Sequence, residues 1–119
     1  MTSLLLINPP LSKKEEYGDL SAAGSCAPPL GLVSLAAVSL ADGYPTTVID
    51  APNEGINVEQ TLERVREARP DVVGITITTP QYHSAADLAC RIKEEYPETL
   101  VIAGGAHPTW VPEESLLRC

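Results

Sequence analysis

A regular alternation of short apolar segments with segments of helical character is the strongest constraint on the fold of this chain. Four segments are rich in leucine, isoleucine, valine and threonine, and each is followed by a proline or glycine turn: Leu4–Ile7, Thr46–Asp50, Asp71–Thr78 and Thr99–Ala103. Their apolar residues run on without alternating with polar ones, which is typical of strands buried on both faces. The alternation predicts an α/β domain with a parallel sheet between two layers of helices.

The segments between the strands predict four helices. A helix from Pro29 to Leu40 is apolar nearly all round and is closed by Gly43, so it must be covered. Three further helices are predicted within the ranges Asn57–Arg69, Gln81–Tyr96 and Pro112–Leu117.

Two segments are predicted as loops. Ala51–Gly55 is the turn that leaves the second strand, and Leu11–Pro28 has no apolar periodicity. Long loops of that kind in compact domains are often functional, so Leu11–Pro28 is predicted to form part of a site.

Composition excludes several classes of partner. The 119 residues suit one domain, and the net charge of −8 argues against nucleic acid and anionic membranes as ligands. The apolar run Leu30–Ala41 is too short to span a bilayer, and Met1–Pro10 does not have the pattern of a signal peptide, which predicts a cytoplasmic protein. The three cysteines have no C-x-x-C spacing, which favours reduced thiols over a disulfide framework or a metal site.

The segments that follow the strands are the places to search for a site, because ligands of such sheets bind outside the carboxyl ends of the strands. After the first strand comes Asn8-Pro9-Pro10 rather than a glycine-rich turn, so a dinucleotide site is not expected, and the chain also has no P-loop lysine motif. Asp50 is interpreted as a turn residue.

Polar groups and glycines follow the third and fourth strands. The hydroxyls of Thr76, Thr78 and Thr79 could bond a ligand rich in amides, although threonine is also simply a good strand residue. Gly104-Gly105 would let a flat ligand lie against the main chain, or could form a plain turn. His107 is open between a ligand, a hydrogen-bond donor and a loop residue. No catalytic pair or triad and no metal-ligand cluster is recognisable at these strand ends, so binding rather than catalysis is expected.

Four motifs in order carry a family resemblance: LLLINPP, PPLGLVSLAAVSLADGYPTTVIDA, PDVVGITITT, and VIAGGAHPT followed by PEE. Together they resemble the N-terminal cobalamin-binding domain of cobalamin-dependent radical S-adenosylmethionine enzymes, the group that includes the anaerobic Mg-protoporphyrin monomethyl ester cyclase. The resemblance implies a flavodoxin-like (Rossmann-like) three-layer fold with strand order 2-1-3-4, in which cobalamin lies across the carboxyl ends of the strands.

The resemblance also implies positions for the cofactor. Thr76 and Thr78, with Thr79 after them, would lie beside the nucleotide tail, for which the pair Gly104 and Gly105 would make room. Residues near the corrin or at the rim of the pocket would be Asn8, Pro9, Pro10, Gly31, Leu32, His107 and Pro108. The Asp-x-His-x-x-Gly motif of other cobalamin proteins does not occur between Asn8 and Pro29, so no histidine ligand to cobalt is expected from the first loop.

In the family a fifth strand and a radical S-adenosylmethionine domain follow, which would hold the iron-sulfur cluster and S-adenosylmethionine. Residues 1–119 are therefore expected to be a cobalamin-binding domain truncated at its C-terminal end and not catalytic alone, from a parent that performs methyl transfer or oxidative cyclisation. The exposed edge of the fourth strand would pair two copies as a homodimer. The alternative is a degenerate flavodoxin-like domain without cofactor that serves protein contacts.

Overall fold

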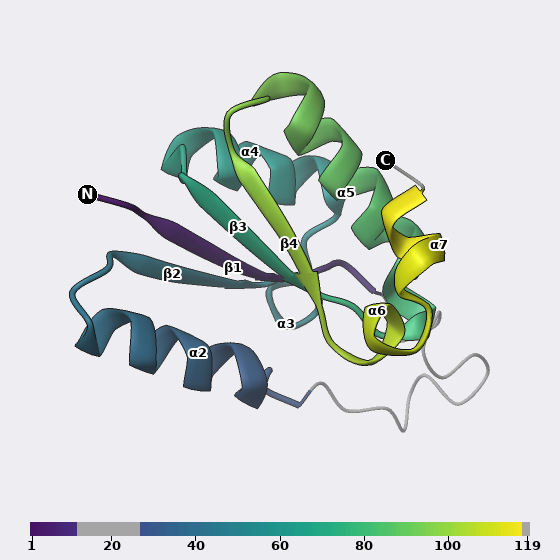
Figure 1. The fold of residues 1–119 in the computed structure, drawn as a ribbon, viewed down its shortest axis with the longest axis horizontal. Coiled ribbons are helices and arrows are strands. Elements are labelled where there is room, and N and C mark those ends of the chain that lie inside the picture. Colours follow the sequence, from purple (N-terminus) through teal and green to yellow (C-terminus); the bar gives the residue numbers. More distant parts are fainter. Residues whose placement is uncertain (12–26, 118–119) are drawn as a thin grey trace.

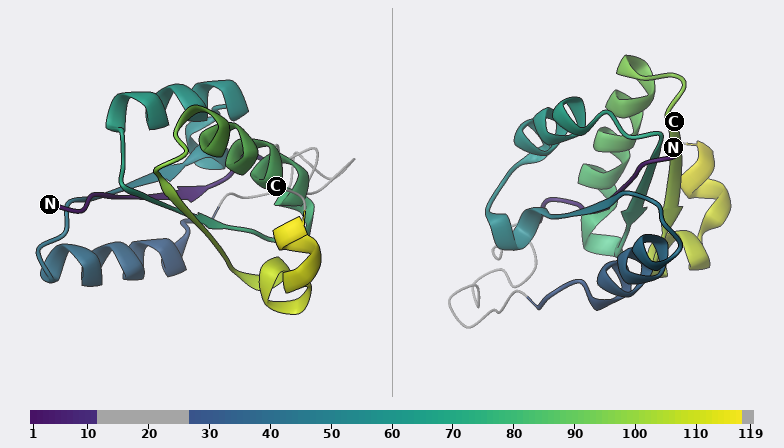
Figure 2. Two further views of the ribbon diagram at one scale, coloured as in Figure 1. Left: turned by 45° about the horizontal axis from the view of Figure 1, so that its top comes forward. Right: turned by 90° about the vertical axis from the view of Figure 1, so that its left-hand side faces the viewer.

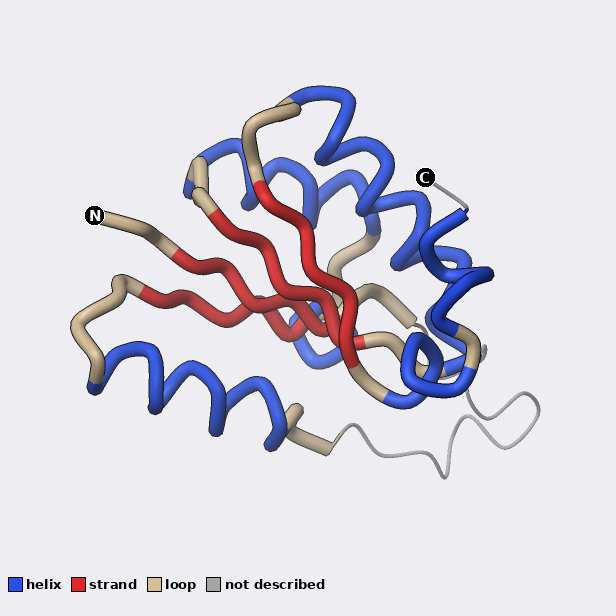
Figure 3. The backbone as a smooth tube through the Cα atoms, in the orientation of Figure 1, coloured by secondary structure: helices blue, strands red, loops and turns tan. Residues whose placement is uncertain are grey.

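Four parallel strands form a single sheet in the order β2-β1-β3-β4 (Figure 1 and Figure 3). The structure is a computed structural model that describes residues 1–11 and 27–117. The strands are β1 (Leu4–Asn8), β2 (Thr46–Asp50), β3 (Val72–Thr76) and β4 (Leu100–Gly104). The parallel pairing and the order predicted from the resemblance are both confirmed.

Helices cover both faces of this sheet and complete a three-layer, flavodoxin-like α/β fold. Helix α2 lies on one face and packs on β1 and β2, whereas α4 and α5 lie on the other face (Figure 2, left). The helices are α2 (Leu30–Ala41), α3 (Ala51–Glu54), α4 (Val58–Ala68), α5 (Tyr82–Glu95), α6 (Ala106–Trp110) and α7 (Pro112–Leu117), and a 3-10 turn, η2, spans Thr79–Gln81.

The two faces of the sheet bury very different amounts of apolar surface. Alternate residues of a strand point to opposite faces, so Leu5 and Ile7 of β1 enter the large core under α4 and α5, and Leu6 points towards α2. The core on the α2 side consists of Leu6, Leu32 and Ala36 with Val48 packed against them. The α2 side therefore has only a small core, over β1 and β2.

The sequence predicts that helix α2 is covered on all sides, but in the structure much of it is exposed. Leu32 and Ala36 are buried against the sheet, while the side chains of five apolar residues are exposed: Leu30, Val33, Leu35, Val38 and Leu40. Within the described residues the expectation of full cover is wrong, because α2 packs on β1 and β2 and no other described helix packs closely against it. The same arrangement leaves much of β3 and β4 uncovered by α2 on this face.

Two element predictions need correction, and one helix was not predicted. The third strand ends at Thr76 rather than Thr78, because Thr78 turns the chain and caps η2 through a capping box with Gln81. The predicted loop Ala51–Gly55 contains helix α3, closed by Gly55 in the left-handed conformation. The segment after Gly105 forms helix α6.

Two other predictions concern the cysteines and the long loop. Cys90 is disulfide-bonded, so the prediction of reduced thiols is wrong for this residue. Most of the long loop predicted for Leu11–Pro28, residues 12–26, lies outside the described residues.

A hydrogen-bonded carboxylate joins the start of the chain to the start of β3. Asp71 accepts hydrogen bonds from the backbone N–H of Ser3 at 2.8 Å and from its hydroxyl at 3.1 Å. The Ser3 N–H, followed by the Ser3 hydroxyl, holds the pKa of the Asp71 carboxyl below its usual value. Because the folded-state pKa is depressed, this contribution to stability is present above the ordinary aspartate pKa and is lost as the pH falls through the folded value.

We therefore expect Asp71→Asn to lower the melting temperature at neutral pH and to reduce the loss of stability on acidification between about pH 5 and pH 2. Thermal unfolding across this pH range measures both effects. Asp42→Asn, at an exposed aspartate that follows α2, is the control. The same acid dependence in Asp71→Asn and in the unchanged chain would contradict this account.

Candidate functional site

A pocket of about 540 Å³ lies between α2 and the face of the sheet formed by β1, β3 and β4. We call it the α2-side pocket. The residues that line it are Leu4, Leu6, Gly31, Leu32, Leu35, Ser39, Val72, Gly74, Ile75, Thr76, Ile102, Gly104 and Gly105. Its lining is mainly aliphatic, with the hydroxyls of Ser39 and Thr76 as the polar side-chain groups. Small-molecule pockets typically have this size and this balance of apolar and polar groups.

Gly104 gives the pocket a floor of bare main chain. A Cβ atom built on Gly104 would meet no atom within 4 Å, so the space above this residue is open. The neighbouring strand contributes Gly74, which pairs with Ile102 in the sheet. A Cβ on Gly74 would lie 2.8 Å from Cδ2 of Leu6, so Leu6 fills the space above it. A flat ligand group can therefore approach the backbone closely at Gly104 but not at Gly74.

Gly105 has a different role from its neighbour. Its φ of 93° and ψ of −169° fall in a region of backbone conformation that is essentially restricted to glycine. A Cβ there would lie 2.9 Å from Oγ1 of Thr76 and 3.0 Å from both the backbone N and O of Ile77. Gly105 therefore lets the chain leave β4 in contact with the end of β3, and Gly104 leaves space for a ligand.

Backbone hydrogen bonds fix this crossing. The N–H of Ile77 donates to the carbonyl of Gly104 at 2.8 Å, and the N–H of His107 donates to the carbonyl of Ile77 at 3.0 Å. The two segments that follow β3 and β4 are thus joined at the edge of the sheet where a ligand would bind.

A buried amide connects the first and third strands at the same edge. Gln81 is 5% exposed, and its Nε2 donates to Oδ1 of Asn8 at 2.7 Å and to the carbonyl of Pro9 at 3.0 Å. Its Oε1 accepts from the hydroxyl of Thr78 at 2.9 Å, and Nδ2 of Asn8 donates to Oδ1 of Asp50 at 3.0 Å. This network holds the start of the long loop against the end of β3.

Gln81 and Gly74 were missed by the sequence analysis. Gly74 had a signal, since a glycine within a strand indicates a close approach of other atoms to the backbone. Gln81 had none, because a glutamine at the start of a helix is ordinarily a surface residue and its burial depends on a contact with Asn8, far away in the sequence.

His107 lies apart from the α2-side pocket. Its ring packs on Tyr82 with centroids 4.3 Å apart, and its Nδ1 lies 3.2 Å from Oγ1 of Thr79. Its Nε2 is buried and has no hydrogen-bond partner among the described residues.

The structure thus divides the predicted site residues into two groups. The α2-side pocket brings together Gly31, Leu32, Thr76, Gly104 and Gly105. The predicted residues that do not line it are Asn8, Pro9, Pro10, Thr78, Thr79, His107 and Pro108. Of these, Asn8, Pro9 and Thr78 belong to the Gln81 network.

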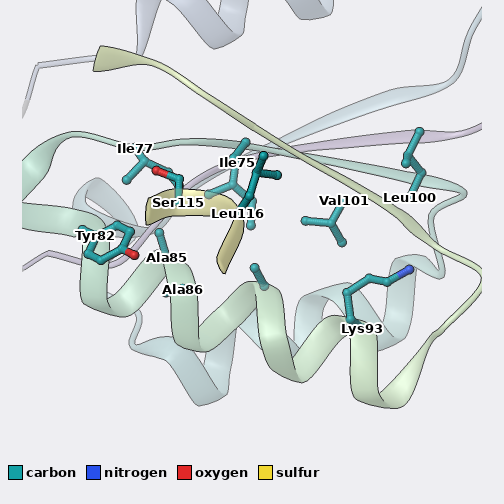
Figure 4. Close-up of a pocket in the computed structure, with 12 residues that line it drawn as sticks. Ile75, Ile77, Tyr82, Ala85, Ala86, Lys93, Leu100, Val101, Ser115 and Leu116 are labelled. Atoms are coloured by element: carbon teal, nitrogen blue, oxygen red, sulfur yellow. The ribbon is translucent and has the colours of Figure 1, made fainter. Parts of the chain in front are cut away.

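A second, smaller cavity of about 300 Å³ lies on the opposite face of β4, between β4, α5 and α7 (Figure 4). We call it the α5-side cavity. Val101 and Ala103 of β4 line it together with alanines of α5. Lys93 reaches its edge, but Nζ of Lys93 donates to the carbonyls of Pro97 at 2.7 Å and Thr99 at 2.9 Å, so this ammonium is already bonded. The cavity is an apolar surface rather than a charged site.

Two searches of the described residues give negative results. Residues 1–11 and 27–117 contain no group of three or more His, Cys, Asp or Glu side chains placed to hold a metal ion. In the same ranges no helix has the length and apolar character required to span a membrane.

The fold is that of α/β domains whose ligands bind at the carboxyl edge of a parallel sheet, and the α2-side pocket runs along one face of the sheet to that edge. The chain matches the B12 binding domain family over residues 18–118, and it belongs to this family. It is therefore a cobalamin-binding module, and the family resemblance of its sequence motifs is confirmed. The pocket fits such a ligand, because the open space above Gly104 and the apolar lining suit a flat aromatic group.

Curated relatives are much longer than this chain. An uncharacterised methyltransferase of Pyrococcus horikoshii is 30% identical over 116 residues, which are 98% of this chain and 24% of the relative. The anaerobic magnesium-protoporphyrin IX monomethyl ester cyclase of Rubrivivax gelatinosus is 31% identical over 85 residues, 71% of this chain and 15% of the relative. The cyclase of that name from Synechocystis is 28% identical over 85 residues, 70% of this chain and 17% of the relative. The chain thus spans a quarter or less of these relatives. No solved structure gives a significant match.

Proposed function

We propose that the chain binds cobalamin with the nucleotide tail in the α2-side pocket and the corrin ring over the carboxyl ends of β1 and β3. The observation that carries this proposal is the open space above Gly104 within a 540 Å³ pocket of apolar lining. The base of the tail is a flat aromatic group, and its burial against aliphatic side chains and bare main chain would supply most of the affinity.

The Gln81 network supports the position of the corrin. Asn8 and Pro9 stand at the carboxyl end of β1, and Gln81 holds both of them against the end of β3. A ring placed over these ends would meet a surface fixed by hydrogen bonds, so less ordering would be needed on binding. In this arrangement the chain binds and orients the cofactor.

The lower face of cobalt would not receive a histidine from the first loop. The segment between Asn8 and Pro29 contains no histidine, and the Nδ1 of His107 lies against Thr79. The proposal therefore assigns the binding energy to the tail pocket and to contacts with the corrin, and it names no protein ligand to cobalt.

We further propose that the module serves a larger protein in which a radical S-adenosylmethionine domain carries the iron-sulfur cluster and performs methyl transfer or oxidative cyclisation. The names of the relatives, a methyltransferase and ring cyclases, support this reaction class. Cobalamin supplies a carrier for a methyl group in such chemistry.

Titration with hydroxocobalamin tests the binding proposal directly. Trp110, the single tryptophan, lies on α6 five residues after Gly105 and reports binding through the quenching of its fluorescence. We expect saturation at one equivalent, with a shift of the visible spectrum of the cofactor. Cobinamide, which lacks the nucleotide tail, should bind about tenfold more weakly or worse because the pocket stays empty.

The outcomes separate the two functions open to this fold. Equal affinity for cobinamide and hydroxocobalamin would contradict the position of the tail. Failure of both to bind would contradict the cobalamin proposal for this chain and favour a domain without cofactor that serves protein contacts, for which the exposed apolar side chains of α2 provide a surface.

A further inference from the structure

Asp50, at the carboxyl end of β2, stands between two side-chain amides. Its Oδ1 accepts a hydrogen bond from Nδ2 of Asn8 at 3.0 Å, and its Oδ2 accepts one from Nδ2 of Asn53. The interpretation of Asp50 as a plain turn residue does not account for these two bonds, because they join β2 to β1 on one side and to α3 on the other. The carboxylate therefore has a place in the network at the ligand-binding edge.

The carboxylate of Asp50 fixes the direction of the hydrogen bonds on the Asn8 side. An ionised carboxylate only accepts hydrogen bonds, so the amide NH2 of Asn8 must point to Asp50 and its Oδ1 to Gln81. Gln81 must then present its own NH2 to Asn8, which leaves Oε1 for the hydroxyl of Thr78. Reversal of either amide would set two donors or two acceptors against each other.

Gln81 passes this direction on because it has no unused hydrogen-bonding group. It is 5% exposed, and its Nε2 donates to Asn8 at 2.7 Å and to the carbonyl of Pro9 at 3.0 Å. Its Oε1 accepts from the hydroxyl of Thr78 at 2.9 Å and from the N–H of Thr78 at 3.3 Å. A buried amide satisfied in this way has no second orientation, since each lost bond would leave a polar group without a partner.

The Asn53 side reaches backbone close to the α2-side pocket. Nδ2 of Asn53 donates to Asp50 and also to the carbonyl of Ala27 at 3.4 Å. Ala27 lies just before α2, whose first turn carries Gly31 and Leu32 of the pocket lining. Hydrogen bonds that begin at Asp50 thus connect the carboxyl ends of β1, β2 and β3 with the backbone that leads into α2.

We propose that Asp50 is the positioning residue of the ligand-binding edge. Its acceptor-only carboxylate orients the amides of Asn8 and Asn53, and through them it holds the Asn8-Pro9-Pro10 turn and the backbone before α2 in the arrangement that the ligand meets. This role rests on the cobalamin function proposed above. Asp50 does not line the α2-side pocket, so its effect on binding passes through the amides. Groups held in place before binding need less ordering when the ligand arrives.

An exchange of the side chains at positions 8 and 50 tests this role. Asn8→Asp alone sets two carboxylates against each other, so we expect it to lower the melting temperature by about 5 °C or more and to weaken hydroxocobalamin binding about tenfold. Asp50→Asn alone should lower both by less, because an amide can accept from one of its two neighbours but opposes the other with its NH2.

The chain with both substitutions should recover. The carboxylate introduced at position 8 accepts from Gln81 and from the amide introduced at position 50, whose oxygen accepts from Asn53, so every bond again joins a donor to an acceptor. We expect the melting temperature to return close to that of the unchanged chain and the affinity to return to within about threefold. Asp50→Asn would thus destabilise the unchanged chain but stabilise the Asn8→Asp chain.

Two matched controls separate hydrogen-bond direction from charge. Glu54→Gln removes a negative charge from α3, four residues after Asp50, and combined with Asn8→Asp it should restore neither quantity. Asn57→Asp makes the same side-chain change at the N-cap of α4, where either residue accepts from the N–H of Gln60, and should leave both quantities unchanged.

Three results would overturn the proposal. The first is no recovery in the double variant, and the second is equal recovery with Glu54→Gln, because net charge would then explain the loss. The third is recovery of the melting temperature without recovery of affinity, because Asn8 would then contact the ligand itself. Failure of the unchanged chain to bind hydroxocobalamin would contradict the proposed function instead, and melting temperatures measured without cofactor would still decide whether Asp50 orients the network.

Discussion

Replacing Gly104 by valine is expected to weaken cobalamin binding by about 10- to 100-fold while leaving the melting temperature nearly unchanged. A side chain at this position finds open space within the fold, and valine is favoured in strands, so the sheet should accept it. The same side chain would occupy the volume assigned to the nucleotide tail. Fluorescence titration of Trp110 and thermal unfolding of the same sample measure the two quantities.

Ala103→Val is the matched control for this prediction. It adds a similar side chain to the adjacent residue of β4, but on the opposite face of the sheet, where it lines the α5-side cavity. Binding should therefore be retained. Wild-type affinity in Gly104→Val, or an equal loss in Ala103→Val, would show that the tail does not lie above Gly104.

Gly105→Ala is expected to reduce the free energy of unfolding by about 2–4 kcal/mol, a large share of the stability of a domain of this size. The φ of 93° and ψ of −169° strain any residue with a Cβ, and the added atom would overlap the backbone of Ile77. Backbone cannot move aside as a flexible side chain can, so relief would require β3 and β4 to separate at their ends. Urea unfolding followed by circular dichroism measures the loss.

The Gly43→Ala variant separates the cost of a strained backbone conformation from the cost of a steric overlap of the added Cβ. Gly43 has a comparable φ of 88°, but a Cβ there would meet nothing within 4 Å. The Gly43→Ala substitution should lower the free energy of unfolding by about 1 kcal/mol, from the backbone conformation alone. If both variants lost the same stability, the contact between Gly105 and the end of β3 would have no energetic role.

Gly104 and Gly105 show how much of the candidate site could be predicted from the sequence. The position of Gly104-Gly105 after an apolar strand was enough to predict main chain accessible to a ligand. The separate roles of the two residues depend on what lies across from each of them: open space for Gly104, and the end of β3 for Gly105. No local pattern contains that information, because the neighbour is a strand about thirty residues earlier.

Errors in the predicted elements have a similar origin. The run Asp71–Thr78 has strand propensity throughout, yet the strand stops at Thr76 because Thr78 and Gln81 cap each other. The burial of Gln81 then follows from its bonds to Asn8 and Pro9. Local propensity could not predict this contact, which forms only once β1 and β3 are adjacent in the sheet.

The sequence by itself determined the α/β class and the parallel direction of the strands, because continuous apolar strands separated by helices can bury both faces in few other ways. It also predicted that polar turns and the glycine pair stand at the carboxyl ends of the strands, where ligands of such sheets bind. The tertiary structure decided that α2 packs mainly on β1 and β2, which leaves the α2-side pocket beside it over β3 and β4. These features depend on which elements pack together in space, and pairwise packing of distant segments is a property that periodicity along the chain does not encode.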